Sequence, residues 1–334
     1  MNRGVVHPFF HPTTVVVVDD NKDFLVNFSL RLGERLAYRL FSSPLEALEY
    51  VNDNPASNVL LSKCITSHSD EFYNIYCENL VEVNVNALQS ELSNRQRFLE
   101  KSVVIVDYDM PGMNGIEFCR LIRDSNVKKI LLTGVADEKL AVAAFNEGVI
   151  DKFIMKQDNA SISTINESIA TFQDDYFEEK GGFIKSSLNN AAFGFLLNPE
   201  FIELFGSLLR LNGVVEYYLT GEPSGYLMLS GDGSVNHLMV LSDKEMHAHA
   251  EVVRDYEGPD DLYRLIEQRE VIPYFCQQGG YYSPDVVDWK KYTYLCSPVD
   301  AAGSYYYALI RDPEFFLQRT HAIFQYNEYL DSLD

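Results

Sequence analysis

From Val103 to Gly115 the chain reads VVIVDYDMPGMNG. Four apolar residues lead into Asp107, and the proline, glycine and asparagine residues that follow it are typical of turns. A short apolar run that ends at turn residues is typical of a strand buried in a parallel sheet. Because open α/β sheets bind ligands at the carboxyl ends of their strands, we expect the Asp107 carboxylate at a ligand-binding edge.

Three other apolar runs also end in polar residues. Asp19 and Asp20 follow the run 14–18, Thr133 and Gly134 follow 129–132, and Lys156 follows 151–155. With Asp107, the predicted strands bring an acid pair, a single acid, a threonine and a lysine to one edge of a sheet. This ordered set is far more specific than a single glycine motif.

The residue types at this edge predict a metal site. Three carboxylates held a few ångströms apart repel one another strongly unless a cation lies between them. Mg²⁺ is a hard cation that proteins bind through one or two carboxylates and several waters. With Mg²⁺ bound, the Asp107 carboxylate could attack an anionic phosphoryl donor and form an acyl phosphate.

The set resembles the receiver domain of two-component response regulators, from about residue 13 to residue 156. The resemblance implies Mg²⁺ as cofactor and a sensor histidine kinase as phosphoryl donor. It also implies that Asp19 and Asp20 are the acidic pair of the metal site and that Asp107 accepts the phosphoryl group. The backbone carbonyl of Asp109 would complete the metal shell.

The same resemblance assigns the remaining residues of the edge. Lys156 would ion-pair with a phosphoryl oxygen, and Thr133 would donate a hydrogen bond to another. Phe153 would change rotamer together with Thr133, and Gly134 would leave room for the phosphoryl group. A phosphorylated receiver would then pair with a second copy as a homodimer.

Alternatives and departures from the family pattern remain. Asp19 and Asp20 could cap a helix, a role compatible with metal binding, and the domain could be a receiver that is not phosphorylated. Gln157 stands where the family usually has proline, which leaves open whether the bond after Lys156 is cis. About residues 53–101 form an insertion where a few connecting residues are usual.

The composition predicts two domains and argues against DNA binding. The chain has 334 residues, 46% of them hydrophobic, and a formal net charge of −22. Residues 181–334 hold 10 Lys and Arg against 22 Asp and Glu. Proteins that bind nucleic acid neutralise phosphates with clustered basic residues, so DNA is an unfavourable partner for this half.

The sequence also predicts the compartment. Five cysteines without paired spacing indicate free thiols in a reducing environment. The first residues do not have the pattern of a signal peptide, and no apolar run reaches the length of a membrane span. We therefore expect a cytoplasmic protein that does not contact a membrane.

We predict a receiver domain at 1–180, with the insertion at about 53–101, and an output domain at 181–334. Alternating strands and helices in the first part predict a doubly wound parallel sheet. Expected helices there are 23–36, 45–52, 116–124, 138–147 and 162–179, the last ending at a hinge of Lys180, Gly181 and Gly182. The pattern at 85–99 predicts an amphipathic helix in the insertion, which we expect to pack on the receiver edge.

The second part predicts an α+β domain on a mostly antiparallel sheet. Expected strands are 214–219, 226–230, 235–241, 292–296 and 305–310, with a hairpin at Gly231–Gly233 and helices at 199–211, 243–255, 260–270 and 314–332. His247, His249 and Glu251 suggest a metal site only on a strand, whereas the capping pattern at 242–245 predicts a helix. Tyr281 and Tyr282, with the run Tyr305–Tyr307, could line an aromatic pocket near Trp289, although such residues more often form half-buried sheet faces or an interface.

No catalytic motif is evident in the output domain, so we do not expect an enzyme. The architecture resembles that of quorum-sensing or cell–cell signalling regulators with an output domain of their own. We expect the output domain to bind a protein or a small ligand. The alternatives are an unusual DNA-binding output domain of a transcriptional regulator and a nucleotide-binding output domain.

Overall fold

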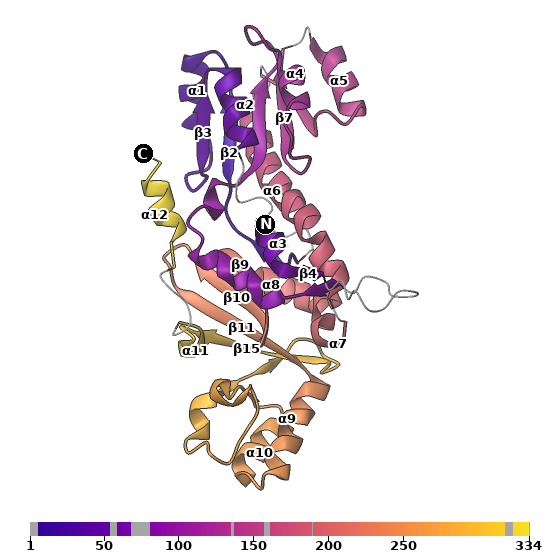
Figure 1. Cartoon of the computed structure of the whole chain (residues 1–334), viewed down its shortest axis with the longest axis vertical. Helices are drawn as coiled ribbons and strands as arrows, with labels where there is room; N and C mark the ends of the chain where they lie inside the picture. Colours follow the sequence, from indigo (N-terminus) through magenta and orange to yellow (C-terminus); the bar gives the residue numbers. More distant parts are fainter. Residues whose placement is uncertain are drawn as a thin grey trace.

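A computed structural model of the chain describes residues 6–53, 59–67, 81–134, 137–156, 161–188, 190–317 and 323–333. It contains two large sheets arranged one below the other, with one long helix running beside both (Figure 1). The bond after Lys156, whose isomer the sequence leaves open, lies outside the described ranges because they end at Lys156.

The first sheet is parallel and has the strand order β3-β2-β6-β7-β8. Its strands are β2 (Thr14–Val18), β3 (Tyr38–Phe41), β6 (Lys101–Asp107), β7 (Lys128–Thr133) and β8 (Lys152–Met155). The helices between and after them are α1 (Lys22–Ser29), α2 (Pro44–Asn52), α4 (Gly115–Arg120), α5 (Glu138–Asn146) and α6 (Ser161–Ser187). The prediction of a doubly wound parallel sheet is confirmed.

Side-chain alternation along the central strands builds one apolar layer on each face of this sheet. Val16 and Val104 point into a core completed by α2, α4 and α5. Val17 and Ile105 point into a second core completed by α1 and α6. All these strand residues are fully buried, so burial on both faces explains the continuous apolar runs in the sequence.

The second sheet is antiparallel and has the strand order β1-β9-β10-β11-β15-β14. Its strands are β1 (Phe9–Phe10), β9 (Val214–Gly221), β10 (Ser224–Ser230), β11 (Val235–Ser242), β14 (Ser297–Pro298) and β15 (Tyr305–Arg311). The predicted hairpin at Gly231–Gly233 joins β10 to β11. The prediction of a second α+β domain on a mostly antiparallel sheet is therefore confirmed.

Helices cover both faces of this sheet. One face holds an aromatic core with α6, α7 (Asn190–Phe193), the 3₁₀ helix η4 (Gly194–Leu197) and α8 (Pro199–Leu211). The other face carries α9 (Asp243–Asp255), α10 (Asp260–Glu267) and the small sheet of β12 (Val271–Pro273) and β13 (Thr293–Leu295). The other elements in the second half of the chain are η5 (Cys276–Gln278), η6 (Trp289–Tyr292), α11 (Glu314–Leu317) and α12 (Tyr326–Asp331).

The insertion packs with the second sheet, which corrects the expectation that its apolar stripe lies on the receiver edge. Its described elements are α3 (Val59–Cys64), β4 (Ile65–Ser67), β5 (Val81–Val83) and the 3₁₀ helices η1 (Val85–Ser93) and η2 (Arg97–Leu99). Leu88 and Leu92 are fully buried in the aromatic core, and η1 contacts β9. The single amphipathic helix predicted at 85–99 is thus two 3₁₀ segments.

The hinge predicted at Lys180–Gly182 is also wrong, because α6 continues to Ser187. A Cβ on Gly181 would lie 2.9 Å from Cδ of Pro8, so this glycine allows the N-terminal segment to pack closely on the helix. Close packing of the N-terminal segment explains why two glycines do not end the helix here. Because β1 and the insertion also join the second sheet, the division expected at residue 180 is not a clean one in space.

Other helices also differ from their predicted lengths: α4 ends at Arg120 instead of residue 124, and α10 ends at Glu267 instead of residue 270. α1 ends at Ser29 instead of residue 36, and the next residues form turns in which Arg31 and Leu32 donate to Phe28 and Ser29. The helix predicted at 314–332 is two short helices, α11 and α12, and residues 318–322 between them lie outside the described ranges.

Candidate functional site

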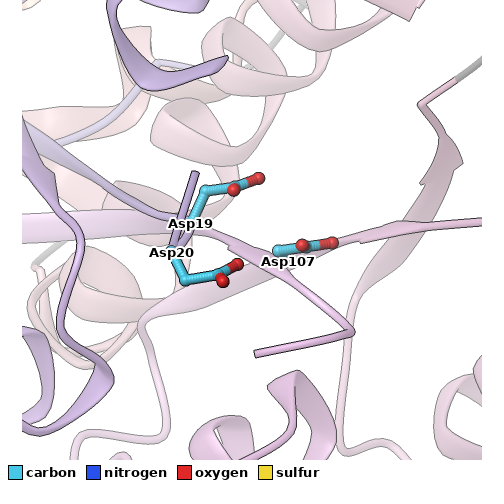
Figure 2. Close-up of side chains that lie close together, drawn as sticks. All are labelled: Asp19, Asp20 and Asp107. Carbon is cyan, nitrogen blue, oxygen red and sulfur yellow. The ribbon is translucent and has the colours of Figure 1, made fainter. Parts of the chain in front are cut away.

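Three carboxylates meet at the carboxyl edge of the parallel sheet. Asp19, Asp20 and Asp107 each offer an oxygen, and these oxygens all lie within 4.8 Å of one another. The three side chains extend to the same side from the ends of β2 and β6 (Figure 2). Asp19 is fully buried and Asp107 is 7% exposed, whereas Asp20 is exposed. The three acids that the sequence placed at one edge of the sheet thus lie close together in the structure.

Asn21 decides between the capping and clustering roles of the acid pair. Its side chain accepts a hydrogen bond from the backbone N–H of Phe24 at 3.0 Å, so Asn21 is the N-cap of α1. Its own N–H donates to Oδ1 of Asp19 at 2.9 Å and fixes that carboxylate. Because Asn21 caps the helix, neither Asp19 nor Asp20 fills that role.

Lys156 supplies the positive charge of the site. Its Nζ donates to Oδ2 of Asp19 at 2.6 Å and forms an ion pair with Oδ2 of Asp107 at 2.7 Å. The ammonium also lies 4.6 Å from the centre of the Phe24 ring. The sequence analysis did not single out Phe24. Phe24 lies on α1 and Lys156 follows β8, so no local sequence pattern could reveal that this ring covers the ammonium group.

Burial and charge shift the pKa values of this pair. Burial raises the pKa of Asp107 above its ordinary value, and the opposing effect of Lys156 is smaller. Burial alone would lower the pKa of Lys156, but its hydrogen bonds and charge interactions with Asp107 and Asp19 raise it. The lysine is therefore charged at neutral pH and partly neutralises the acid cluster.

Thr133 and Phe153 lie on the neighbouring strands. Thr133 is fully buried at the end of β7, and its hydroxyl donates to the carbonyl of Gly134 at 3.1 Å. Asp107 pairs with Leu132 in the ladder, so Thr133 is one residue beyond the partner of the aspartate. Phe153 is half-buried against the core under α2, α4 and α5.

The turn after Asp107 is held by close backbone contacts. A Cβ on Gly115 would lie 2.3 Å from the carbonyl oxygen of Asp107, so only glycine fits at the start of α4. Asn114 and Glu117 form a reciprocal capping box at the same helix start. The sequence marked Gly115 as a turn residue but did not reveal its contact with the aspartate. Asp109 is exposed two residues after Asp107, and the role of its carbonyl stays a prediction.

The donor set fits a hard divalent cation. Three carboxylates offer oxygens only, which suits Mg²⁺ and does not suit softer metals that need nitrogen or sulfur ligands. With a lysine beside them, the same groups could stabilise the negative charge of a transferred phosphoryl group.

Comparison with solved structures decides the family. The structure of the Legionella pneumophila response regulator LqsR is 34% identical in sequence, with a TM-score of 0.75, and the match covers 98% of this chain and 96% of that chain. The chain belongs to the response regulators. The sequence profile described as "Response regulator receiver domain" matches residues 75–165 of this response regulator, which supports a part in two-component signalling.

Two curated relatives match only a short stretch. The cyclic di-GMP phosphodiesterase response regulator RpfG of Xanthomonas campestris is 43% identical over 58 residues, which are 16% of this chain and 15% of that protein. The DNA-binding response regulator MtrA of Mycolicibacterium paratuberculosis is 41% identical over 61 residues, 18% of this chain and 27% of that protein. This response regulator thus shares less than a third of the length of either relative.

Other candidate residues in the output half do not form a metal cluster. His247 and His249 lie on α9 and diverge as expected for a helix: His247 is exposed beside Glu251, and His249 is 8% exposed and stacks on Tyr281. Burial lowers the pKa of His249 to about 4. Within the described residues, the acid cluster is the only group of three or more such side chains close enough to hold an ion.

A cavity of about 530 Å³ lies at the end of β15. The residues that line it include two basic side chains, Lys291 and Arg311, two acidic ones, Asp312 and Glu314, and two tyrosines, Tyr292 and Tyr294. Tyr281, Tyr282 and Trp289, expected near an aromatic pocket, do not line this cavity. Within the described ranges, none of the helices is long and apolar enough to cross a membrane.

Proposed function

We propose that this response regulator accepts a phosphoryl group on Asp107 from a sensor histidine kinase, with Mg²⁺ as cofactor. The observation that carries the proposal is the junction of three carboxylates and one lysine at a single sheet edge. An ion pair with a purely structural role needs one carboxylate for one lysine. This edge holds three carboxylates and one lysine, so Lys156 alone does not neutralise its negative charge.

The residues of the edge would divide the work among them. Asp19, Asp20, Asp107 and the carbonyl of Asp109 would hold Mg²⁺, which neutralises the charge of the phosphoryl donor when bound. The Asp107 carboxylate is the nucleophile. Lys156 orients that carboxylate before the reaction and would bind a phosphoryl oxygen after it.

A switch would follow from the same geometry. The Thr133 hydroxyl now bonds to a backbone carbonyl and would turn to the phosphoryl group, and Phe153 would move into the space that it leaves. The exposed face of α5, with Leu140 and Phe145 about half exposed, would then pair with a second copy. We propose a homodimer in the phosphorylated state.

The output half would bind a protein or a small ligand and not catalyse a reaction. Its excess of acidic residues is unfavourable for DNA, and the cavity at the end of β15 is large enough for a small molecule. We propose a role in cell–cell signalling of the quorum-sensing type, in the cytoplasm. The chain would divide into units of about 1–180 and 181–334, with β1 and the insertion of the first unit packed on the second sheet. A DNA-binding or nucleotide-binding output domain is the alternative.

Two experiments test these proposals. Phosphoryl labelling of the full chain by acetyl phosphate and Mg²⁺, absent in Asp107→Asn, tests the site. A gel shift with total genomic DNA fragments at physiological salt, with and without beryllofluoride, tests the DNA alternative. A shift that depends on beryllofluoride would overturn the proposed output, and a thermal-shift screen with nucleotides tests the nucleotide alternative.

A further inference from the structure

The helix α12 packs near the start of the parallel sheet, away from the carboxyl ends of its strands (Figure 1). Tyr326 and Tyr329 are 4% and 5% exposed. Their ring centres lie 5.1 and 5.5 Å from that of Phe98, which precedes β6. A segment that follows the second sheet in the chain therefore packs on the residues that lead into the parallel sheet.

A directed hydrogen-bond chain joins this helix to β2. The hydroxyl of Thr14 donates to the carbonyl of Phe98 at 2.7 Å. Because that proton is used, the hydroxyl of Tyr329, 2.7 Å away, is the donor to Thr14. The backbone N–H of Thr14 also donates to the carbonyl of Glu100 at 2.8 Å. Two hydrogen bonds thus fix the first residue of β2 on the segment before β6, and a third joins it to α12.

The position of Thr14 determines how the two strands pair. Thr14 pairs with Lys101, but Val16 pairs with Val104, so β6 holds one extra residue between these two pairs. From Val16 onward the register is regular up to Val18, and its continuation places Asp19 beside Asp107. A slip by one residue would move Asp107 by about 3.3 Å along the strand and turn its side chain to the other face.

We propose that Tyr329 and Thr14 are positioning residues for the acid cluster. By fixing the bulge between β2 and β6, they set the distance between the Asp19–Asp20 pair and Asp107, and with it the affinity for Mg²⁺. This inference rests on the proposed function, because it takes the acid cluster as a Mg²⁺ site. Since α12 continues from the output domain, the state of that domain and the metal site are coupled in both directions.

The test removes single hydroxyl groups and measures Mg²⁺ affinity by calorimetry on the full chain. Tyr329→Phe and Thr14→Val keep the shape of the side chain and break the hydrogen-bond chain. We expect each to weaken Mg²⁺ binding by about threefold to tenfold. The double variant should be no weaker than Thr14→Val alone, because both changes act on one chain of hydrogen bonds. Thr14→Ser keeps the hydroxyl and should bind like the wild type.

Val253→Ala provides the control for a general loss of stability. Val253 is 1% exposed in the core under α9, far along the chain from both strands. This variant should lower the melting temperature and leave Mg²⁺ affinity unchanged. An equal loss of affinity in Val253→Ala would overturn the inference.

The outcomes separate this inference from the proposed function. Mg²⁺ binding that is lost in Asp107→Asn but unchanged in Tyr329→Phe and Thr14→Val would overturn the inference and leave the proposed function intact. A wild-type chain that does not bind Mg²⁺ would overturn both.

Discussion

Lys156 and Asp107 come from different strands and form an ion pair, with Nζ 2.7 Å from Oδ2. The same ammonium group contacts Asp19 at 2.6 Å. Lys156 therefore occupies two carboxylates that a metal ion would also need. We therefore expect Lys156 and Mg²⁺ to compete for these two carboxylates.

Removal of this lysine should separate metal binding from phosphoryl transfer. In Lys156→Met we expect Mg²⁺ affinity to rise by about threefold to tenfold, because a competing cation is lost from the carboxylates. Labelling by acetyl phosphate should slow by about tenfold or more, because a group that stabilises the transferred charge is lost. Lys139→Met, which removes an exposed lysine on α5, serves as the control. Unchanged or weaker Mg²⁺ binding in Lys156→Met would count against the competition.

The buried pair of Arg97 and Glu216 should stabilise the contact between the insertion and β9. Nε and Nη2 of Arg97 donate to the two carboxylate oxygens of Glu216, each at 2.9 Å, and both side chains are 1% exposed or less. Because Arg97→Met leaves Glu216 buried without its cation, we expect a loss of about 3–5 kcal/mol in the free energy of unfolding. Urea denaturation followed by circular dichroism measures it.

An exposed pair gives the matched control for that experiment. Arg120 and Glu147 form an ion pair with side chains 54% and 55% exposed. Because solvent screens this pair, Arg120→Met should cost less than about 1 kcal/mol. Similar losses in the two variants would contradict the view that the buried pair holds the two parts together.

Much of the parallel sheet and its site could be predicted from the sequence, because the central strands of that sheet hold continuous apolar runs. Parallel strands end at one edge, so Asp19, Asp107, Thr133 and Lys156 could be placed together without knowledge of any contact. The order of residue types along the chain was sufficient.

The contacts that the insertion and α12 make with the two sheets could not be predicted in this way. Glu216 lies 119 residues from Arg97, and Tyr329 lies 315 residues from Thr14. Such pairs form only when distant parts of the chain pack together, and no periodic pattern in the sequence predicts which residues will then meet. The end of α6 was mispredicted at Gly181 and Gly182 for the same reason. The low helix propensity of glycine favours an end of the helix there, but tertiary packing overrides it.

Glu100 should make stability depend on pH in the acidic range. It is fully buried, accepts hydrogen bonds from His11 at 2.9 Å and Tyr176 at 2.5 Å, and forms an ion pair with Lys180. Burial alone would raise its pKa, but Lys180 and His11 outweigh burial and lower the pKa to about 2. Because the pKa of Glu100 is lower in the folded than in the unfolded chain, its carboxylate stabilises the fold at every pH above the ordinary glutamate pKa. This stabilisation is lost as the pH falls towards 2.

The variant Glu100→Gln tests this dependence. At neutral pH the wild type should be more stable than the variant by on the order of 3 kcal/mol. The difference should shrink as the pH falls from about 5 to about 2. Urea denaturation of both proteins across this range gives the comparison, and a difference that does not change with pH would contradict the assigned pKa.

Phosphorylation should change self-association through the face of α5. Beryllofluoride with Mg²⁺ should convert monomer to dimer at micromolar concentration, seen as doubled mass by light scattering after size exclusion. Phe145→Glu places a charge on the exposed apolar face and should prevent the shift. Leu30→Glu changes an 80% exposed leucine beyond α1 and should not. A constant mass at a concentration where beryllofluoride occupies the site would refute the dimer model.

Locating the phosphoryl group is the most direct test of the central claim. The full chain is incubated with Mg²⁺ and acetyl phosphate, digested, and mapped by mass spectrometry. The account predicts one phosphoryl group, on the peptide that contains Asp107. The label should disappear in Asp107→Asn and persist in Asp109→Asn, the neighbouring exposed acid. Label that persists in Asp107→Asn, or that maps to another residue, would contradict the account.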